Sequence, residues 1–202
     1  AARGMDLVLV ARRRAPLDEL AEELRDENGV EVRCFDGDLA SETFLQTLVA
    51  MCSDLDLGLV ICNAAQAPIG EFASRDTGDL MRVVDVNVRS PLLLLRGLLP
   101  QMRARGRGGA ILMTSLTGNL GTPGIAAYAS SKAFLRVLGE SLWYELKDQG
   151  IDVLIISPFK PDALGPIVDA AKAKGIPVVV NDIGGGGTAY DVIVISDNYN
   201  GG

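Results

Sequence analysis

Residues Ala110–Ser157 read AILMTSLTGNLGTPGIAAYASSKAFLRVLGESLWYELKDQGIDVLIIS. The stretch begins with an apolar run at Ala110–Thr114, continues with a long helical pattern at Ala126–Gln149, and ends with a second apolar run at Val153–Ser157. Short, nearly continuous apolar runs are typical of parallel strands that are buried on both faces. The stretch therefore predicts a strand–helix–strand unit with a right-handed crossover.

The same alternation extends outward over the rest of the chain. Further strands are expected at Leu7–Ala11, Val30–Phe35, Leu57–Cys62, Pro177–Asn181 and Val192–Ser196. Further helices are expected at Pro16–Glu27, Glu42–Met51, Asp76–Arg105 and Ala163–Lys174. Regular strand–helix alternation predicts an α/β fold, a three-layer Rossmann-like sheet of mostly parallel strands with helices on both faces.

Composition and charge exclude several classes of function. The chain has 202 residues, 48% of them hydrophobic, which is enough for one core and one domain. Its net charge of −7 argues against a nucleic-acid partner, because phosphate binding requires a basic face. The sequence contains no histidine. Catalytic Ser-His-Asp and Cys-His sets and His-ligated zinc are therefore excluded, and we predict no metal site.

The cysteines and the apolar runs predict a soluble protein of a reducing compartment. Cys34, Cys52 and Cys62 are too far apart for a Cys-x-x-Cys pair. We interpret them as reduced core thiols of a cytoplasmic protein, the alternative being a disulfide. The richest apolar stretch, Pro91–Pro100, contains Arg96 and is shorter than the roughly 20 residues that a bilayer requires. We expect no membrane partner.

The strongest chemical signal consists of Ser115, Tyr128 and Lys132. Tyr128 and Lys132 are four residues apart in the expected helix Ala126–Gln149 and therefore share one of its faces. A neighbouring ammonium favours the phenolate, so a tyrosine in this position can give and take a proton. Ser115 follows a strand and is expected at the carboxyl edge of the sheet, where open α/β folds bind ligands. The alternative is a solvated lysine beside a half-buried tyrosine.

Asn87 provides a second signal in the expected helix Asp76–Arg105. It lies four residues before Pro91, and proline has no N–H for the carbonyl of Asn87. A carbonyl released in the middle of a helix can hold a water, and near Lys132 such a water would extend a proton relay. The alternative is an ordinary proline kink in a packed helix.

Together these residues resemble the short-chain dehydrogenase/reductase family. The resemblance is carried by Asn63-Ala64-Ala65 after a strand, Asn87-Val88 in the next helix, and Ser115 thirteen residues before Tyr128-Ala129-Ser130-Ser131-Lys132. It implies hydride transfer between a nicotinamide and a small-molecule carbonyl or alcohol. Tyr128 would be the acid and base, Lys132 would favour its phenolate and hold the nicotinamide ribose, Ser115 would position the substrate oxygen, and Asn87 would support the water relay.

The resemblance also implies a set of cofactor-binding residues. The strand Leu7–Val10 is followed by Arg12 and Arg13 instead of an acidic residue that would accept from a ribose 2′-hydroxyl. Arginine suits a 2′-phosphate, which favours NADP over NAD; the alternative is a basic surface turn. Asp38 resembles the family's adenine contact, and Asn63 with Ala64 would line the adenosine ribose.

One part of the family pattern does not occur in the printed residues. The resemblance runs from about Arg3 to Pro158, and the family's first strand and glycine-rich turn would precede Ala1. That turn brings backbone N–H groups and a helix N-terminus to the pyrophosphate. We therefore expect weak or absent cofactor binding.

From about Ile151 onward the chain resembles periplasmic sugar-binding proteins of the ribose-binding type. The resemblance implies a sugar-binding role for Asp182, although Ile183 stands where the family usually has arginine. We therefore divide one α/β domain into a dehydrogenase-like part, residues 1–158, and a sugar-binding-protein-like part, residues 159–202. A chain that changes from one family to another in this way predicts a recombined or engineered chimera. The segments that carry the second resemblance are Ile155-Ile156-Ser157-Pro158, Pro161-Asp162-Ala163-Leu164, Gly175-Ile176-Pro177-Val178-Val179 and Ser196-Asp197-Asn198.

Three interpretations follow from the sequence: an NADP-dependent reductase, a chimera that keeps the reductase residues without turnover, and a sugar-binding fragment. The family resemblance also suggests a homo-oligomer. For Val192–Ser196 two placements are open. It fills the central position of the family's missing first strand and pairs with Leu9 or Leu59, or it follows Pro177–Asn181 in sequential order beyond Val153–Ser157.

Overall fold

The computed structural model describes residues 1, 4–156, 179–181 and 192–194. The chain divides into two compact units, one of residues 1–36 with 158–202 and the other of residues 37–157. Each unit is described by itself. The expected helix Ala163–Lys174 lies outside the described residues, as do Asp182 and Ile183.

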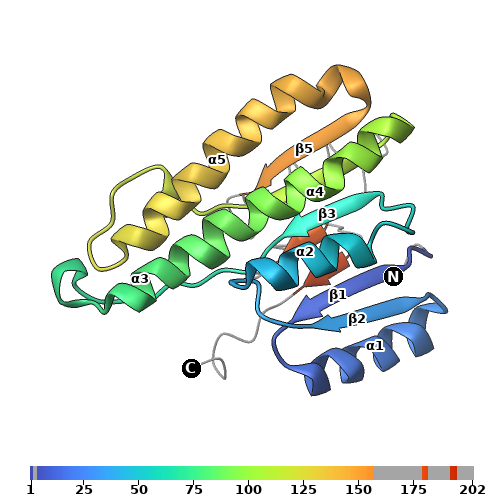
Figure 1. Ribbon diagram of the computed structural model, residues 1–202, viewed down its shortest axis with the longest axis horizontal. Helices are drawn as coiled ribbons and strands as arrows, with labels where there is room; N and C mark the ends of the chain where they lie inside the picture. The colour runs from blue at the N-terminus through green and yellow to red at the C-terminus, as the bar shows by residue number, and fades with distance from the viewer. Residues whose placement is uncertain (2–3, 157–178, 182–191, 195–202) are drawn as a thin grey trace. The chain divides into compact units, whose positions relative to one another are not determined.

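The first unit contains a parallel pair of strands covered by one helix. β1 (Leu7–Ala11) and β2 (Val32–Asp36) pair in register from Leu7 with Val32 to Ala11 with Asp36. α1 (Arg14–Asn28) packs against both strands (Figure 1). Its buried face joins a small apolar core with side chains from both strands. The core residues are Ala1, Ala21, Val30, Val32, Leu7, Leu9, Leu24 and Cys34.

The same unit contains a second, shorter pair of strands. β6 (Val179–Asn181) and β7 (Val192–Val194) are parallel, and Val194 pairs with Asn181. Among the ladders of the described residues, none joins Val194 to Leu9 or Leu59. The pairing of Val194 with Leu9 or Leu59, expected if this strand took the place of the family's first strand, is therefore not observed among the described residues.

The second unit contains a three-stranded parallel sheet in the order β3, β4, β5. β3 spans Leu59–Cys62, β4 spans Gly108–Met113 and β5 spans Ile151–Ile156. β4 is central, and its side chains from Gly109 to Met113 are all buried. Central burial of this kind agrees with the nearly continuous apolar run from which the strand was predicted.

Three helices lie side by side across one face of this sheet (Figure 1). α2 spans Glu42–Met51, α4 spans Ser90–Arg105 and α5 spans Ala126–Leu146, which a short 3₁₀ turn, η4 (Lys147–Gln149), extends. α4 and α5 contact β4, and α2 contacts α4. The largest fully buried side chains are distributed over these helices and strands. They include Leu45, Met102, Leu112, Leu135 and Ile151.

The single long helix expected at Asp76–Arg105 was wrong in its interior. The structure divides it into α3 (Thr77–Val84), a π-helical turn, η2 (Asp85–Arg89), and α4 (Ser90–Arg105). A π turn adds one residue to the helix without ending it. The segment therefore keeps its overall direction while the side chains beyond η2 are rotated about the axis.

Pro91 explains where the π turn lies. The N–H of Ser90 donates to the carbonyl of Asp85, five residues earlier, which is the π pattern. Pro91 cannot donate to the carbonyl of Asn87, so the ordinary i to i−4 ladder does not continue through this turn. The irregularity that the sequence predicts at this place thus takes the form of a π turn.

The α/β class with parallel strands and alternating helices is confirmed. β1 and α2 have the bounds expected from the sequence, and the ends of most other described elements differ by no more than three residues. Of the helices that the structure describes, none is long and apolar enough to cross a membrane.

One glycine allows a close backbone approach next to the expected chemistry. Gly118 ends the 3₁₀ turn η3 (Leu116–Gly118), which packs against α5. A Cβ atom added to Gly118 would stand 2.9 Å from the backbone nitrogen of Ala133 and 3.1 Å from the carbonyl oxygen of Lys132. Because these are backbone atoms, only a shift of η3 or α5 would relieve the contact.

We predict that Gly118→Ala destabilises the protein by about 1–3 kcal/mol, because the new methyl group overpacks the η3–α5 contact. Urea denaturation followed by the fluorescence of Trp143, the one tryptophan, measures the change. Gly121→Ala is the control, because a Cβ there has no atom within 4 Å; we expect an effect within about 0.5 kcal/mol. Equal stability of the two variants would contradict the prediction.

Candidate active site

Tyr128 and Lys132 lie together on the first turns of α5. The ammonium nitrogen of Lys132 is 5.5 Å from the centroid of the Tyr128 ring. Lys132 is only 3% exposed, and its Nζ donates to the carbonyl of Met113 at 2.7 Å. A buried cation requires such a partner, since desolvation without one is very costly. The sequence-predicted pair is thus held against the end of β4.

Ser115 follows β4 after one intervening residue, Thr114, and caps η3. It lies two residues after Met113, whose carbonyl binds Lys132. Its Oγ accepts from the hydroxyl of Thr117 at 3.0 Å and from the Thr117 N–H at 3.4 Å. The side chain is half-buried. Ser115 therefore stands at the carboxyl edge of the sheet, as its position after the strand predicts.

Asn87 is the fully buried centre of the π turn. Its Nδ2 donates to the Gln66 carbonyl and to Ser131 Oγ, both at 2.9 Å, and its Oδ1 accepts from the Gln66 N–H at 2.7 Å. With no exposed surface, the amide depends on these protein partners. Asn87 thereby joins three segments: the π turn, the loop after β3, and α5.

Two residues of this network were not among the candidates from the sequence. Ser131 belongs to the Tyr-Ala-Ser-Ser-Lys segment, but its partner Asn87 is 44 residues away in the chain. Gln66 contributes only backbone atoms, so its side-chain type carries no signal. The one clue in the sequence was spacing: Ser131 lies four residues before Leu135, so both share one face of α5, and the structure buries that face.

The end of β3 brings a thiol and two expected cofactor residues close to the same edge. Cys62 is buried, and burial raises the pKa of its thiol to about 12, with the Lys132 charge acting in the opposite direction. The thiol therefore remains protonated at neutral pH and is a poor nucleophile. Asn63 is half-buried and Ala64 is exposed, both directly after the strand.

Asp38 is held by an ion pair. Arg82 of α3 donates through Nη2 to both carboxylate oxygens, at 2.9 and 3.1 Å, and the Ala40 N–H donates to Oδ1 at 2.9 Å. The carboxylate is 42% exposed, so this pair remains accessible to solvent. The expected adenine contact is thus oriented by Arg82, a residue that the sequence did not single out.

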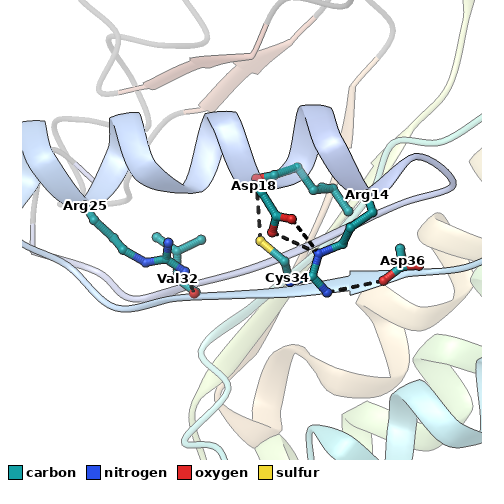
Figure 2. Close-up of polar contacts among 7 residues, drawn as sticks. Arg14, Asp18, Arg25, Val32, Cys34 and Asp36 are labelled. Atoms are coloured by element: carbon teal, nitrogen blue, oxygen red, sulfur yellow. Dashed lines mark hydrogen bonds and ion pairs between the residues drawn. The ribbon is translucent and has the colours of Figure 1, made fainter.

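Arg12 and Arg13 belong to the first unit, at the carboxyl end of β1. The next residue, Arg14, forms ion pairs with Asp18 and Asp36, at 2.8 and 3.3 Å. Figure 2 shows both contacts. These carboxylates raise the pKa of Arg14, and the Arg14 guanidinium lowers the pKa of Asp18. Arg12 and Arg13 are exposed, and within the described part of the chain neither has a hydrogen bond or ion pair.

The described contacts thus connect Asn87 through Ser131 to the Tyr128 backbone, and Lys132 to the end of β4, which Ser115 follows in the chain. Asp38, Asn63 and Ala64 belong to the same unit, whereas Arg12 and Arg13 belong to the other. The described residues contain no group of three or more acidic or cysteine side chains that could hold a metal ion. The arrangement combines a phenol, an ammonium and a hydroxyl, which are groups suited to proton transfer at an oxygen.

Two family models match the chain. One, described as short chain dehydrogenase, matches residues 1–162. The other, described as periplasmic binding protein domain, matches residues 142–202. Both resemblances expected from the sequence are confirmed by these matches.

Relatives and solved structures agree with the first match. A 7beta-hydroxysteroid dehydrogenase of Clostridium sardiniense is 32% identical over 157 residues, which cover 78% of this chain and 60% of the relative. A very-long-chain 3-oxoacyl-CoA reductase of Neurospora crassa is 33% identical over 174 residues, 83% and 52% of the two chains. The structure of a short-chain dehydrogenase from Sphingobium yanoikuyae in complex with NADPH is similar, with a TM-score of 0.75 and 33% identity, covering 78% of this chain and 62% of that one.

The chain spans 60% and 52% of the lengths of these two curated relatives. The family match at residues 1–162 includes β4 and α5, which carry the candidate site. Because the family match covers 162 of the 202 residues, the chain belongs to the short-chain dehydrogenase family.

Proposed function

We propose that this chain carries the active site of an NADP(H)-dependent oxidoreductase that interconverts a small-molecule carbonyl and an alcohol. The contact of the buried Lys132 ammonium with both the Tyr128 ring and the carboxyl end of β4 carries the proposal. It is supported by the match to the short-chain dehydrogenase family and by relatives whose names describe a dehydrogenase and a reductase.

In the proposed reaction Tyr128 gives its phenolic proton to the carbonyl oxygen of the substrate. Lys132 stabilises the phenolate that remains, because an ammonium close to the ring favours the charged form. Ser115 presents its hydroxyl at the strand edge, where it can donate to the same oxygen. NADPH, when bound, would supply the hydride. Asn87 holds the π turn in place and, in the proposal, supports the water through which Tyr128 is protonated again.

The residues fit a dinucleotide in part. Arg12 and Arg13 are exposed cations without a partner among the described residues, and such guanidinium groups suit a 2′-phosphate. Lys132 suits the nicotinamide ribose, and Asp38, Asn63 and Ala64 suit the adenosine portion. We further propose that this chain binds the cofactor weakly.

A second candidate is a chimeric Rossmann-like scaffold without turnover. The observation that favours it is the meeting of two family models on one chain, with the periplasmic binding protein match beginning at residue 142 and the dehydrogenase match ending at residue 162. Under this alternative the catalytic side chains are retained but no competent cofactor complex forms. A sugar-binding fragment, proposed from the same second match, remains the third alternative. Turnover distinguishes the first candidate from the other two.

The cellular setting is also proposed. Cys34, Cys52 and Cys62 form no disulfide in the structure, which supports the proposal of a reducing, cytoplasmic compartment. We propose a small-molecule carbonyl or alcohol as the partner of the site, and no nucleic acid or membrane. A homo-oligomer remains a prediction from the family resemblance.

Tyr128→Phe tests the mechanism. We expect NADPH-dependent reduction of a 7-oxo steroid or a 3-oxoacyl thioester, substrates chosen from the names of the relatives, to fall at least about 100-fold, because the proposed proton donor is removed. Absorbance at the nicotinamide band measures the rate. Tyr144→Phe, an exposed tyrosine of the same helix, is the control and should be without effect. Unchanged turnover in Tyr128→Phe would refute the mechanism.

Cofactor affinity tests the second part of the proposal. Titration of NADPH fluorescence with the 202-residue chain should give a dissociation constant well above about 1 μM, with NADH weaker still. The double variant Arg12→Gln, Arg13→Gln should remove the preference for NADPH, because the partner of the 2′-phosphate is lost. Arg96→Gln removes an exposed charge elsewhere and should leave the preference intact. Micromolar or tighter binding would show that another segment supplies the phosphate site.

A further inference from the structure

Ser131 is a buried hydroxyl between the two segments that carry the candidate site. It is 4% exposed. Its Oγ donates to the carbonyl of Tyr128, three residues earlier in α5, at 2.7 Å. The same oxygen accepts from Nδ2 of Asn87 at 2.9 Å. Both capacities of the hydroxyl, to donate and to accept, are therefore used in a place without water contact.

These bonds determine the orientation of the Asn87 amide. Asn87 Oδ1 accepts from the N–H of Gln66, and Asn87 Nδ2 donates to the Gln66 carbonyl. Each side of the amide therefore faces a complementary backbone group, and a flipped amide would lose both bonds. The second Nδ2 proton points to Ser131. Replacing the Ser131 hydroxyl by hydrogen would leave a donor of a fully buried amide unsatisfied, which proteins avoid.

Ser131 also lies between the two groups of the proposed chemistry. Lys132 is the next residue, and Tyr128 is the residue whose carbonyl Ser131 binds. The hydrogen bond from Asn87 to Ser131 joins this turn of α5 to the π turn. A small rotation of the turn would move the phenol and the ammonium together with respect to Ser115 and the strand edge.

We propose that Ser131 is a positioning residue of this site. Its hydroxyl locks the first turns of α5 to Asn87 and so determines where Tyr128 and Lys132 stand. The inference rests on the proposed oxidoreductase function for its kinetic consequence, but its structural consequence can be measured in the absence of any turnover.

The first experiment is NMR spectroscopy of the full chain. In Ser131→Ala we expect one Nδ2 proton of Asn87 to exchange with solvent at least about tenfold faster, because its buried bond is lost. The ring signals of Tyr128 should shift in the same variant. Ser131→Thr keeps the hydroxyl and should restore both. Ser130→Ala is the matched control, since Ser130 is the exposed neighbour on the same helix.

The second experiment is steady-state kinetics with NADPH and the carbonyl substrates named above. Ser131→Ala should lower kcat about 10- to 100-fold with little change in the KM for NADPH, since misplacement of reacting groups acts on the chemical step. Ser131→Thr should recover most of the rate, and Ser130→Ala should equal the parent. Partial unfolding would also lower the apparent kcat without changing the KM, so each kcat is divided by the folded fraction measured from the NMR spectrum of the same variant.

Several outcomes would overturn the inference. If Ser131→Ala leaves both the Asn87 exchange and the Tyr128 ring signals unchanged, Ser131 does not position the site. The same holds if Ser130→Ala produces an equal loss. If Ser131→Ala does not fold, Ser131→Cys replaces it, because a thiol fills the site but accepts weakly. If the parent protein shows no turnover, the proposed function fails, and the NMR result alone decides for or against positioning.

Discussion

A buried amide must have its hydrogen bonds satisfied inside the protein, and in this chain that constraint acts at Asn87. Its side chain has no exposed surface and binds the Gln66 backbone in both directions as well as Ser131. Since each missing bond would carry a desolvation penalty of about 1–3 kcal/mol, the loop after β3, the π turn and α5 are held together as one assembly. The candidate site is built on that assembly.

A second constraint acts on the other side of α5. The Lys132 ammonium, almost without solvent contact, binds the carbonyl of Met113 at the end of β4, and Gly118 lets η3 approach the backbone of the same residue. Ser115 lies between Met113 and η3 in the chain and is therefore carried to the same strand edge. The Lys132 bond and the close approach at Gly118 thus hold the first turns of α5 against the end of β4 and η3.

The residues proposed for cofactor binding are constrained differently from those proposed for proton transfer. Asp38 is oriented by its ion pair with Arg82, and Arg14 is ion-paired with two carboxylates. Arg12 and Arg13 have no such partner among the described residues. Exposed guanidinium groups of this kind add little to stability and are available for a ligand phosphate. The second family match lies at the other end of the chain, where residues 142–202 resemble a periplasmic binding protein domain.

The sequence by itself determined the α/β class, because apolar runs such as Ile111–Met113 and helical spacing such as that of Tyr128 and Lys132 are local patterns. It also located the irregularity near Asn87, since the missing N–H of Pro91 is a local property. Only the tertiary structure decided that this irregularity is a π turn and that Ser131, Gln66 and Arg82 belong to the site. Their partners are 21 to 44 residues away in the chain, and no local pattern reports a hydrogen bond that forms only when distant segments pack together.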